Sequence, residues 1–444
     1  MIFMKKTYLS TIKEIFLFSI PLIAGQVGQM LFGIGDIIVA GRYSNDVVAA
    51  LGVANGLLAP LLMFGLGITF AVGPLTSQFR GKNEKDKSIF ANAHYLMLTV
   101  SVGLLVAIGA LIVALPLFNF NPTITPLIKD YILIAGPSII PAILFQISKE
   151  YLQAWDKNIF SNSLILFFNV INVGMNYIFI FGEFGFPEMG IKGAALATLI
   201  SRTLMFGALF IYTKAKFEID WNFNQVLFKR IYKFGIPIGL GTLSEVLMFS
   251  AVTVLIGKMS IIASASHNIV INLASCTFMI PLAISSAASV KVGKEYGAGS
   301  QQGILIYSLS SIIMVAIIMI GTCAMYLSFP DILVRFATDD PELISYSAGL
   351  LLYVGLFQIP DGIQVTLWGI LRGLEETKHP MILSLIFNWC IGIPIGYWLA
   401  TSKGMEAAGL WAGLAIGLTI MSVGLSCVFF FKFRVVKSTL VPMA

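Results

Sequence analysis

Charged residues are scarce in this chain, where Asp, Glu, Lys and Arg make up only 11% of 444 residues. A soluble domain carries roughly 25%, so too little polar surface is present to coat a globule in water. Hydrophobic residues reach 57%, and the mean hydropathy is +0.90. This composition excludes a soluble protein and predicts an integral membrane protein surrounded by the lipid bilayer. The net charge of +6 therefore belongs to loops, and no nucleic-acid partner is expected.

Cysteine and histidine are also rare. The four cysteines lie inside apolar runs and show neither paired nor metal-ligand spacing: Cys276, Cys323, Cys390 and Cys427. We expect them to fill space as thiols, without a redox or metal role. The three histidines, at positions 94, 267 and 379, lie near the ends of apolar segments. That placement favours the membrane interface over a proton relay, and no cofactor is expected.

Long apolar segments fill most of the chain. A helix needs about 20 mostly apolar residues to cross a bilayer, and charged or Gly/Pro/Asn clusters separate twelve segments of this kind. We expect spans at approximately 14–40, 47–79, 88–117, 126–152, 158–182, 190–214, 229–256, 263–293, 302–328, 341–371, 379–401 and 407–433. The length of several segments indicates tilt or projection beyond the bilayer.

The positions of Lys and Arg predict that both termini are cytoplasmic, because cytoplasmic loops carry an excess of these residues. With that orientation, the external loops hold only six of the 28: Arg42, Lys129, Lys192, Lys258, Arg335 and Lys403. Arg202 lies inside the sixth span, where it can pair with a carboxylate or reach the interface. Lys5, Lys6 and Lys13 precede an apolar run that is too long for a signal-peptide core, so we expect it to be retained as the first span.

The two halves of the chain resemble each other. FSIPL at 18–22 matches FGIPI at 234–238, and three pairs of glycines share the same offset of 216. We expect an all-α membrane protein with two six-helix bundles around a central cleft. The predicted parts are an N-lobe at 1–215, a cytoplasmic linker at 216–228 and a C-lobe at 229–444. Parallel repeats around a cleft are typical of transporters, and prolines inside spans, such as Pro21, tend to bend their helices.

Three carboxylates interrupt the apolar spans: Asp36 in span 1, Glu245 in span 7 and Asp361 in span 10. A charge at the centre of a membrane helix costs at least about 2.5–3.5 kcal/mol, so such residues are usually functional. The repeat aligns Glu245 with Gln29, so the acids are not a symmetric set. The C-terminal half has two interior acids, and the N-terminal half has one.

Polar side chains accompany these acids at helical spacing. Span 1 carries a stripe of Gln26, Gln29 and Asp36; span 10 carries Phe357, Asp361, Gln364 and Trp368; and span 5 carries Asn169, Asn172 and Asn176. Residues three or four apart share one face of a helix. Polar stripes face protein or water rather than lipid, so we expect these helices to line interior cavities.

The chemistry of these groups predicts a cation-coupled exporter. Carboxylates in a low-dielectric interior can load and release protons, and carboxylates with amide oxygens can coordinate Na⁺. Asp36 with the span-5 asparagines, and Glu245 with Asp361, fit either ion. An acidic cleft lined with Phe, Met and Trp also attracts organic cations. Ion and substrate would then be coupled through the same carboxylates.

Several motifs resemble the multidrug and toxic compound extrusion (MATE) family, in particular its bacterial NorM-like branch. They are GIGDIIVAG in span 1, NVINVGMNYIFIFG before GAALAT, SEVLMFS in span 7 and FQIPDGIQVTLWGILRGLEETKHP across spans 10 and 11. The resemblance covers nearly the whole chain. It implies that Asp36, Glu245 and Asp361 are coupling and substrate-linked carboxylates, and that Asn172, Asn176 and Thr198 complete a cation site around Asp36. It also implies a bend at Pro21. The chain departs from the family pattern at two positions. Asn176 is an amide where some members have an acid, and Phe357 stands where some Na⁺-coupled members have tyrosine.

The expected function is H⁺- or Na⁺-coupled antiport that exports organic cations or drugs by alternating access. The alternative is a flippase for lipid-linked oligosaccharides from the same superfamily, whose pyrophosphate substrate needs cationic groups. An intramembrane enzyme is not expected, because the spans show no nucleophile motif and no central histidine. An ion channel fits the 6+6 repeat less well. We expect a monomer in the bacterial plasma (inner) membrane.

Overall fold

The structure is a computed structural model that describes residues 7–84 and 87–440, and these residues form helices and connecting loops without any strand. The helices of the first half are α1 (Tyr8–Gly41), α2 (Asn45–Thr69), α3 (Val72–Gly81), α4 (Ile89–Ala114), η1 (Leu115–Phe118), α5 (Thr125–Ala135), η2 (Gly136–Ser138), α6 (Ile139–Ala154), α7 (Asn158–Phe181), η3 (Glu183–Gly185) and α8 (Ile191–Lys216).

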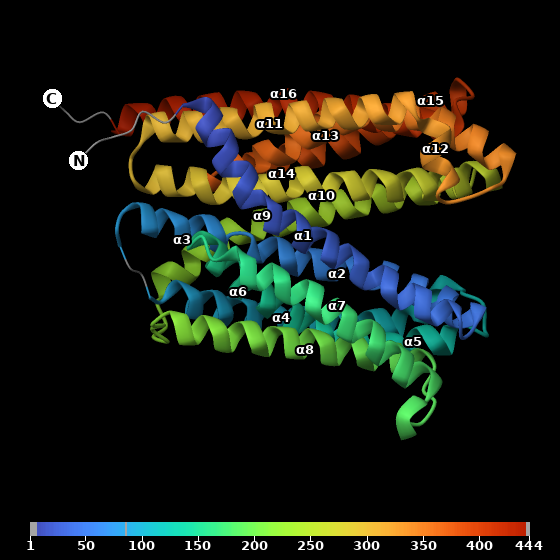
Figure 1. Cartoon of the computed structure of the whole chain (residues 1–444). Coiled ribbons are helices and arrows are strands. Elements are labelled where there is room, and N and C mark those ends of the chain that lie inside the picture. The colour runs from blue at the N-terminus through green and yellow to red at the C-terminus, as the bar shows by residue number, and fades with distance from the viewer. Residues whose placement is uncertain (1–6, 85–86, 441–444) are drawn as a thin grey trace. The chain divides into compact units, whose positions relative to one another are not determined.

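The second half continues in the same way (Figure 1). Its helices are α9 (Gln225–Gly257), α10 (Ile261–Gly297), α11 (Gln301–Ser328), α12 (Pro330–Arg335), α13 (Pro341–Gly373), α14 (Lys378–Ser384), η4 (Leu385–Gly392), α15 (Ile393–Ser402) and α16 (Glu406–Leu440). Because α8 ends at Lys216 and α9 begins at Gln225, the non-helical part of the expected linker is limited to 217–224.

The prediction of twelve membrane spans is confirmed. Within the described residues, twelve helical segments are long and apolar enough to cross a bilayer, and each coincides with one expected from the sequence. Most extend a few residues beyond the expected bounds, because helical hydrogen bonding continues past the apolar stretch into the interface. Three of the lysines assigned to the cytoplasmic side by the charge distribution, Lys5, Lys6 and Lys85, lie outside the described residues.

Several spans are interrupted at identifiable sequence features. The fourth span changes from α5 to α6 through the 3₁₀ turn η2, whose sequence GPS contains a proline without a backbone N–H donor. The eleventh span contains the π-helical segment η4 between α14 and α15. Interruptions of this kind often occur at functional sites, and both supply side chains to the clusters described below.

The chain divides into two compact units. The C-unit contains the described residues up to Ile23, Ser77–Glu84 and the described residues from Leu240 onward; the N-unit contains Ala24–Thr76 and the described part of Lys85–Gly239. The chain thus changes unit inside α1 and inside α9, two residues after Pro21 and two residues after Pro237. These two positions are related by the same offset of 216 that relates the repeats.

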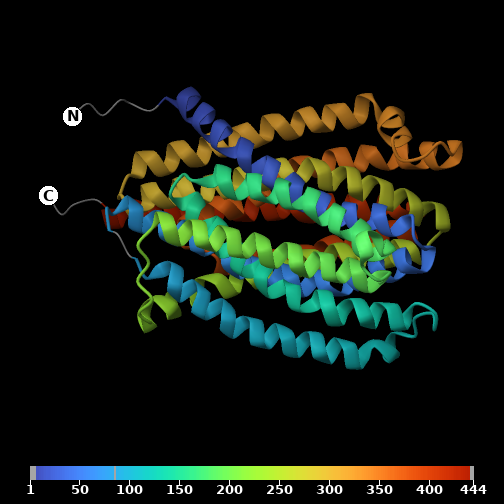
Figure 2. The ribbon, with the colours of Figure 1, turned by 60° about the horizontal axis from the view of Figure 1, so that its bottom comes forward.

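Each unit has its own packed interior of long helices (Figures 1 and 2). In the C-unit, α10, α11 and α16 pack against α13, and the core includes Trp411, Tyr326 and Phe357. In the N-unit, α7 and α6 both pack against α8, with Phe145 and Leu209 in the core between them. Each unit thereby buries one of the two polar clusters that contain the membrane-embedded carboxylates.

Candidate functional site

Close packing of α1 on α7 places Asp36 beside the asparagines of span 5. A Cβ atom at Gly25 would lie 1.8 Å from Oδ1 of Asn162, and one at Gly35 would lie 2.8 Å from Cγ2 of Val173. Only glycine permits this approach without displacing the neighbouring side chain. Asp36, one residue further along, is 3% exposed and faces the interior of the N-unit.

The Asp36 carboxylate is bound from two helices. Nδ2 of Asn176 on α7 donates a hydrogen bond to Oδ1 of Asp36 at 2.5 Å, and the Thr198 hydroxyl on α8 lies 3.3 Å from Oδ2. Nδ2 of Asn176 also donates to Oδ1 of Asn172 at 3.2 Å. The structure therefore brings together all four residues expected at the N-lobe cation site, which we call the N-site. Oδ1 of Asn176 is buried and has no hydrogen-bond partner.

A basic and a phenolic group complete the surroundings of the N-site. Arg202 lies one helical turn after Thr198, and its Nη1 donates to the Ser138 hydroxyl at 2.9 Å. Its charge interacts with that of Asp36 without a direct ion pair. Tyr131 is 1% exposed, and its hydroxyl donates to Oδ1 of Asn55 at 3.2 Å. The sequence left open whether Arg202 faces a carboxylate or reaches the membrane interface. In the structure its guanidinium faces the interior of the N-unit.

The two acids of the C-terminal half meet in the C-unit. Nε2 of Gln364 on α13 donates to Oε1 of Glu245 on α9 at 3.1 Å and lies 3.3 Å from Oδ1 of Asp361. Asp361 is 3% exposed, and Glu245 is half-buried. Oε1 of Gln364 is buried and has no partner. We call these three residues the C-site.

Arg372 lies near the C-site, and close packing of helices fixes its position. Its Nη2 donates to the Ser285 hydroxyl at 3.0 Å, and its charge interacts with that of Glu245. A Cβ atom at Gly369 would lie 2.2 Å from the carbonyl oxygen of Ser285, so α13 approaches the α10 backbone directly. The Ser285 hydroxyl in turn donates to the Val365 carbonyl at 2.6 Å.

Aromatic side chains surround the C-site within its own unit. Phe357 is 2% exposed and meets Trp411 edge-on, with ring centroids 5.2 Å apart. Trp368 is half-buried and packs over Gly241 on α9. Trp389, in the π-helical segment, donates to the Ser244 hydroxyl at 2.9 Å, next to Glu245. Phe357 thus belongs to the core of the C-unit, whereas Trp368 retains accessible surface.

The remaining residues predicted from the sequence take different positions. Gln26 is 9% exposed, whereas Gln29 is exposed, so the stripe on α1 is not uniformly buried. Asn169 uses its Nδ2 to donate to the Gly28 carbonyl at 2.7 Å, which fixes α7 to α1. Pro21 lies inside α1, which continues through it as one helix.

Sequence reasoning missed several members of these clusters. Tyr131 and Asn55 belong to no recognisable motif, and Arg372 lies at the end of a span, where a positive charge is ordinary. The signal available for Arg372 was its spacing of eleven residues from Asp361, which returns to nearly the same helix face. Ser138 and Ser285 gave no signal, because serine is common in membrane helices.

Both sites offer oxygen atoms to a small cation. The N-site has the Asp36 carboxylate, two amide oxygens and a hydroxyl, and the C-site has two carboxylates and an amide oxygen. Buried amide oxygens without partners, as at Asn176 and Gln364, are the kind of atom that a bound cation satisfies. The described part of the chain has no group of three or more His, Cys, Asp or Glu side chains that could hold a metal ion.

Comparisons with known proteins agree with this architecture. The sequence model of the MatE family matches residues 21–178 and again 237–398, two starting points that differ by the repeat offset of 216. The chain is 30% identical to a probable multidrug resistance protein NorM of Haemophilus ducreyi and 29% identical to one of Agrobacterium fabrum, each covering 94% of this chain and 93% of the relative.

Solved structures show the same fold. A Vibrio cholerae MATE transporter matches with a TM-score of 0.87 at 17% identity, over 96% of this chain and 98% of that one. A eukaryotic MATE transporter matches with a TM-score of 0.86 at 19% identity, over 98% of this chain and 100% of the other. Because the family model covers well over half of the sequence in two matched halves, this chain belongs to the MatE family.

Proposed function

We propose that this protein is a cation-coupled antiporter that exports small organic cations, including drugs, by alternating access. Family membership supports transport, and the similar curated proteins carry the name multidrug resistance protein. The residues at the N-site and the C-site support the coupling to H⁺ or Na⁺. No enzymatic role is proposed.

One arrangement, present in both units, carries the proposal. At the N-site, the NH₂ group of Asn176 lies between Oδ1 of Asp36 and Oδ1 of Asn172. At the C-site, the NH₂ group of Gln364 lies between Oε1 of Glu245 and Oδ1 of Asp361. At each site, the partly positive NH₂ group of the amide lies between two oxygen acceptors. A small cation would bind at the same position.

Cation binding at the N-site follows from this arrangement. A proton on Asp36 removes the charge that Asn176 and Arg202 face, and Na⁺ would draw on the oxygens of Asp36, Asn172 and Thr198. A bound Na⁺ would displace the Asn176 NH₂ group from Asp36, and the buried Asn176 carbonyl oxygen, which has no partner, would serve as a further ligand. Coupling begins with this exchange of a fixed donor for a mobile cation.

The C-site combines negative charge with aromatic surface. Two carboxylates that share one amide donor repel each other when both are ionised, so a proton or a cation stabilises the pair. An organic cation meets the same requirement and gains contact with the accessible ring of Trp368, through cation–π attraction. Ion and cargo therefore compete at Glu245 and Asp361, which is the requirement for antiport.

We place the bending that alternating access needs in α1 and α9. Both helices contain a proline, and the chain changes compact unit two residues after each one. A proline lacks the N–H donor and crowds the preceding turn, so it permits bending at low energy. We propose Pro21 as a hinge, with Pro237 as its counterpart in the second repeat.

The proposed setting is the bacterial plasma membrane, with both termini cytoplasmic and the protein working as a monomer. The functional halves are the N-lobe (1–215) and the C-lobe (229–444). A flippase for lipid-linked oligosaccharides would have to bind pyrophosphate at these sites. The two clusters contain three carboxylates and have two arginines nearby, both held by serine hydroxyls, which favours a cationic cargo.

The proposal is tested in liposomes that contain the full chain. Ethidium movement is followed by fluorescence while a pH gradient or a Na⁺ gradient is imposed separately. We expect one gradient to drive ethidium transport into the liposomes, and we expect Asp36→Asn, Glu245→Gln and Asp361→Asn to abolish it. Transport that needs neither gradient, or that survives all three substitutions, would refute the proposal.

A further inference from the structure

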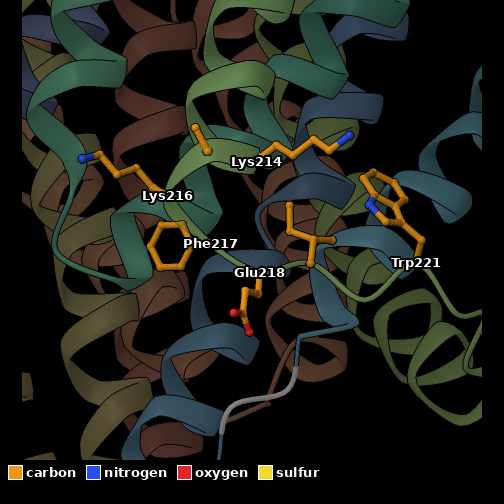
Figure 3. Close-up of a pocket in the computed structure, with 7 residues that line it drawn as sticks. Lys214, Lys216, Phe217, Glu218 and Trp221 are labelled. Carbon is orange, nitrogen blue, oxygen red and sulfur yellow. The ribbon is translucent and has the colours of Figure 1, made fainter.

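A pocket of about 260 Å³ lies where α8 ends and the connection to α9 begins (Figure 3). Its lining includes Lys214, Lys216, Phe217, Glu218 and Trp221. In Figure 3, Lys214 extends toward the side of Trp221, and Lys216 extends the other way, so the two ammonium groups flank the pocket. The distribution of Lys and Arg predicts that this end of α8 is cytoplasmic.

The pocket is positively charged overall. Lys214 is exposed and forms no ion pair with any residue that the structure describes. The negative charge of Glu218 is offset by an ion pair with Lys87. Phe217 lines the pocket, and the Lys157 ammonium lies 4.8 Å from the centre of its ring. Two lysines therefore line a cavity whose one lining acid is already paired, and a third lysine lies against a ring of the lining.

The connection that forms the pocket is held in place. Nδ2 of Asn92 on α4 donates to the Asn222 carbonyl at 3.3 Å, and Oδ1 of Asn92 accepts from the Asn224 amide at 2.9 Å. The Tyr95 hydroxyl donates to the Trp221 carbonyl at 2.6 Å. The pocket is thus preformed, and a ligand does not have to order the segment when it binds.

Large apolar side chains next to the pocket are open to the surroundings. Ile211 on α8 is 69% exposed, and Ile159 at the start of α7 is 67% exposed. Phe160 stacks on Tyr212 at 4.1 Å, and the Lys216 ammonium lies 6.0 Å from the Tyr212 ring centre. Because α7 and α8 are membrane spans, this apolar surface faces acyl chains and the lysines lie at the level of the lipid headgroups.

We propose that this pocket binds the headgroup of an anionic phospholipid of the cytoplasmic leaflet. The phosphate lies between Lys214 and Lys216, Lys157 adds a third positive charge, and the acyl chains lie along Ile159 and Ile211. Aromatic residues beside lysines are a common arrangement at the level of lipid headgroups. Basic residues near a membrane surface attract anionic lipids. The proposal is independent of the transport function.

The test uses the purified full chain in neutral detergent, titrated with phosphatidylglycerol or with phosphatidylcholine of the same acyl chains. Bound lipid is counted by native mass spectrometry, and the melting temperature is recorded alongside. We expect phosphatidylglycerol to bind more tightly and to stabilise the protein more. Removal of one positive charge weakens binding by about fivefold, so Lys157→Gln/Lys214→Gln/Lys216→Gln should weaken it by roughly 100-fold.

A matched control removes three lysines from the opposite ends of the spans: Lys129→Gln/Lys258→Gln/Lys403→Gln. This control should change the affinity for phosphatidylglycerol by less than about twofold. The corresponding Lys→Arg triple should retain binding, and Lys214→Gln alone gives a readout if the Gln triple does not fold. The proposal is overturned by equal losses in test and control variants or by equal binding of phosphatidylcholine. Stabilisation by millimolar inorganic phosphate that equals that by phosphatidylglycerol would also overturn it, because it would indicate a site for soluble anions.

Discussion

The N-site and the C-site use the same components in different proportions. Each places a side-chain NH₂ group between two oxygen acceptors, leaves the carbonyl oxygen of that amide buried without a partner, and has an arginine nearby that is held by a serine hydroxyl. The N-site has one carboxylate, and the C-site has two. With its arginine counted, the N-site is close to neutral when Asp36 is ionised, whereas the C-site carries a net negative charge.

This difference favours separate roles. A site with one carboxylate and a facing arginine changes its net charge from zero to positive when it takes up a proton, which suits an ion-responsive group. A site with two carboxylates attracts a cation even with an arginine nearby, which suits a site shared by cargo and ion. The position of Glu245 produces the difference, because its counterpart in the other repeat, Gln29, is exposed and contributes no charge to the N-site.

The largest expected effect comes from neutralising the C-site. Glu245→Gln and Asp361→Asn should each reduce gradient-driven ethidium transport in liposomes by at least tenfold, because each removes a charge that the proposed mechanism assigns to both cargo and ion. A loss of 1.4 kcal/mol in binding is already a tenfold change. Glu376→Gln, an acid between two spans, serves as the control and should stay within about twofold. Near-normal transport by Asp361→Asn would remove the C-site from the mechanism.

The roles of the N-site and the C-site can be distinguished by measuring ethidium binding separately from ion-driven transport. Asp36→Asn should abolish gradient-driven ethidium transport, but it should leave the ethidium dissociation constant within about twofold. Asp361→Asn should weaken ethidium binding by roughly tenfold or more. Both values come from a fluorescence titration of purified protein. If the two variants weakened ethidium binding equally, the division of roles between the sites would be wrong.

A second carboxylate should make the N-site more like the C-site. Asn176→Asp places a negative group against Asp36 in the position of the present amide donor, so a bound cation is needed to offset the repulsion. We expect the apparent affinity for the coupling ion to rise by about tenfold, measured as the ion concentration that gives half-maximal transport. Asn169→Asp, on the same helix but bound to the Gly28 carbonyl, is the control. If transport by Asn176→Asp depended on the ion concentration as the unmodified protein does, the number of carboxylates would not be what distinguishes the N-site from the C-site.

Removal of the bridging amides should affect stability by a smaller amount. Hydrogen bonds to charged groups contribute about 1.5–3 kcal/mol, so Gln364→Leu and Asn176→Leu should each lower the melting temperature in detergent. Gln364 faces two carboxylates, and Asn176 faces only one. The loss should therefore be greater for Gln364→Leu, and a greater loss for Asn176→Leu would contradict this account of the C-site.

The smallest effect concerns Glu376, which lies outside the spans and provides a reference for the buried acids. Burial raises the pKa of Glu376, but hydrogen bonds from His379 and the charge of Lys432 outweigh it and hold the pKa below 4.5. A lowered pKa stabilises the fold while the group is ionised. Glu376→Gln should therefore lower stability slightly above pH 4.5, by up to about 1 kcal/mol. The difference should disappear as the pH falls below that value, and a difference that grows on acidification would contradict it.

Much of the architecture could be predicted from local sequence. The twelve spans and the repeat follow from the apolar segments and the offset of 216, because backbone groups in a bilayer must satisfy their hydrogen bonds within helices. The three embedded acids were visible because a charge among apolar residues is conspicuous. Asn172, Asn176 and Thr198 were expected beside Asp36 from the family resemblance, and the structure places them there.

Other features depended on distant parts of the chain. The contacts of Asn176 with Asp36, of Gln364 with Glu245, and of the two arginines with Ser138 and Ser285 join residues from different helices, so no spacing within one helix predicts them. The exposure of Gln29 and the burial of Phe357 were likewise decided by which helices pack beside them. The number of membrane helices, and which of them carry charge, could be predicted from the chain alone, because both depend on the transfer of single segments into lipid. The partners of each carboxylate could not, because a hydrogen bond in a low-dielectric interior depends on the packing of several helices at once.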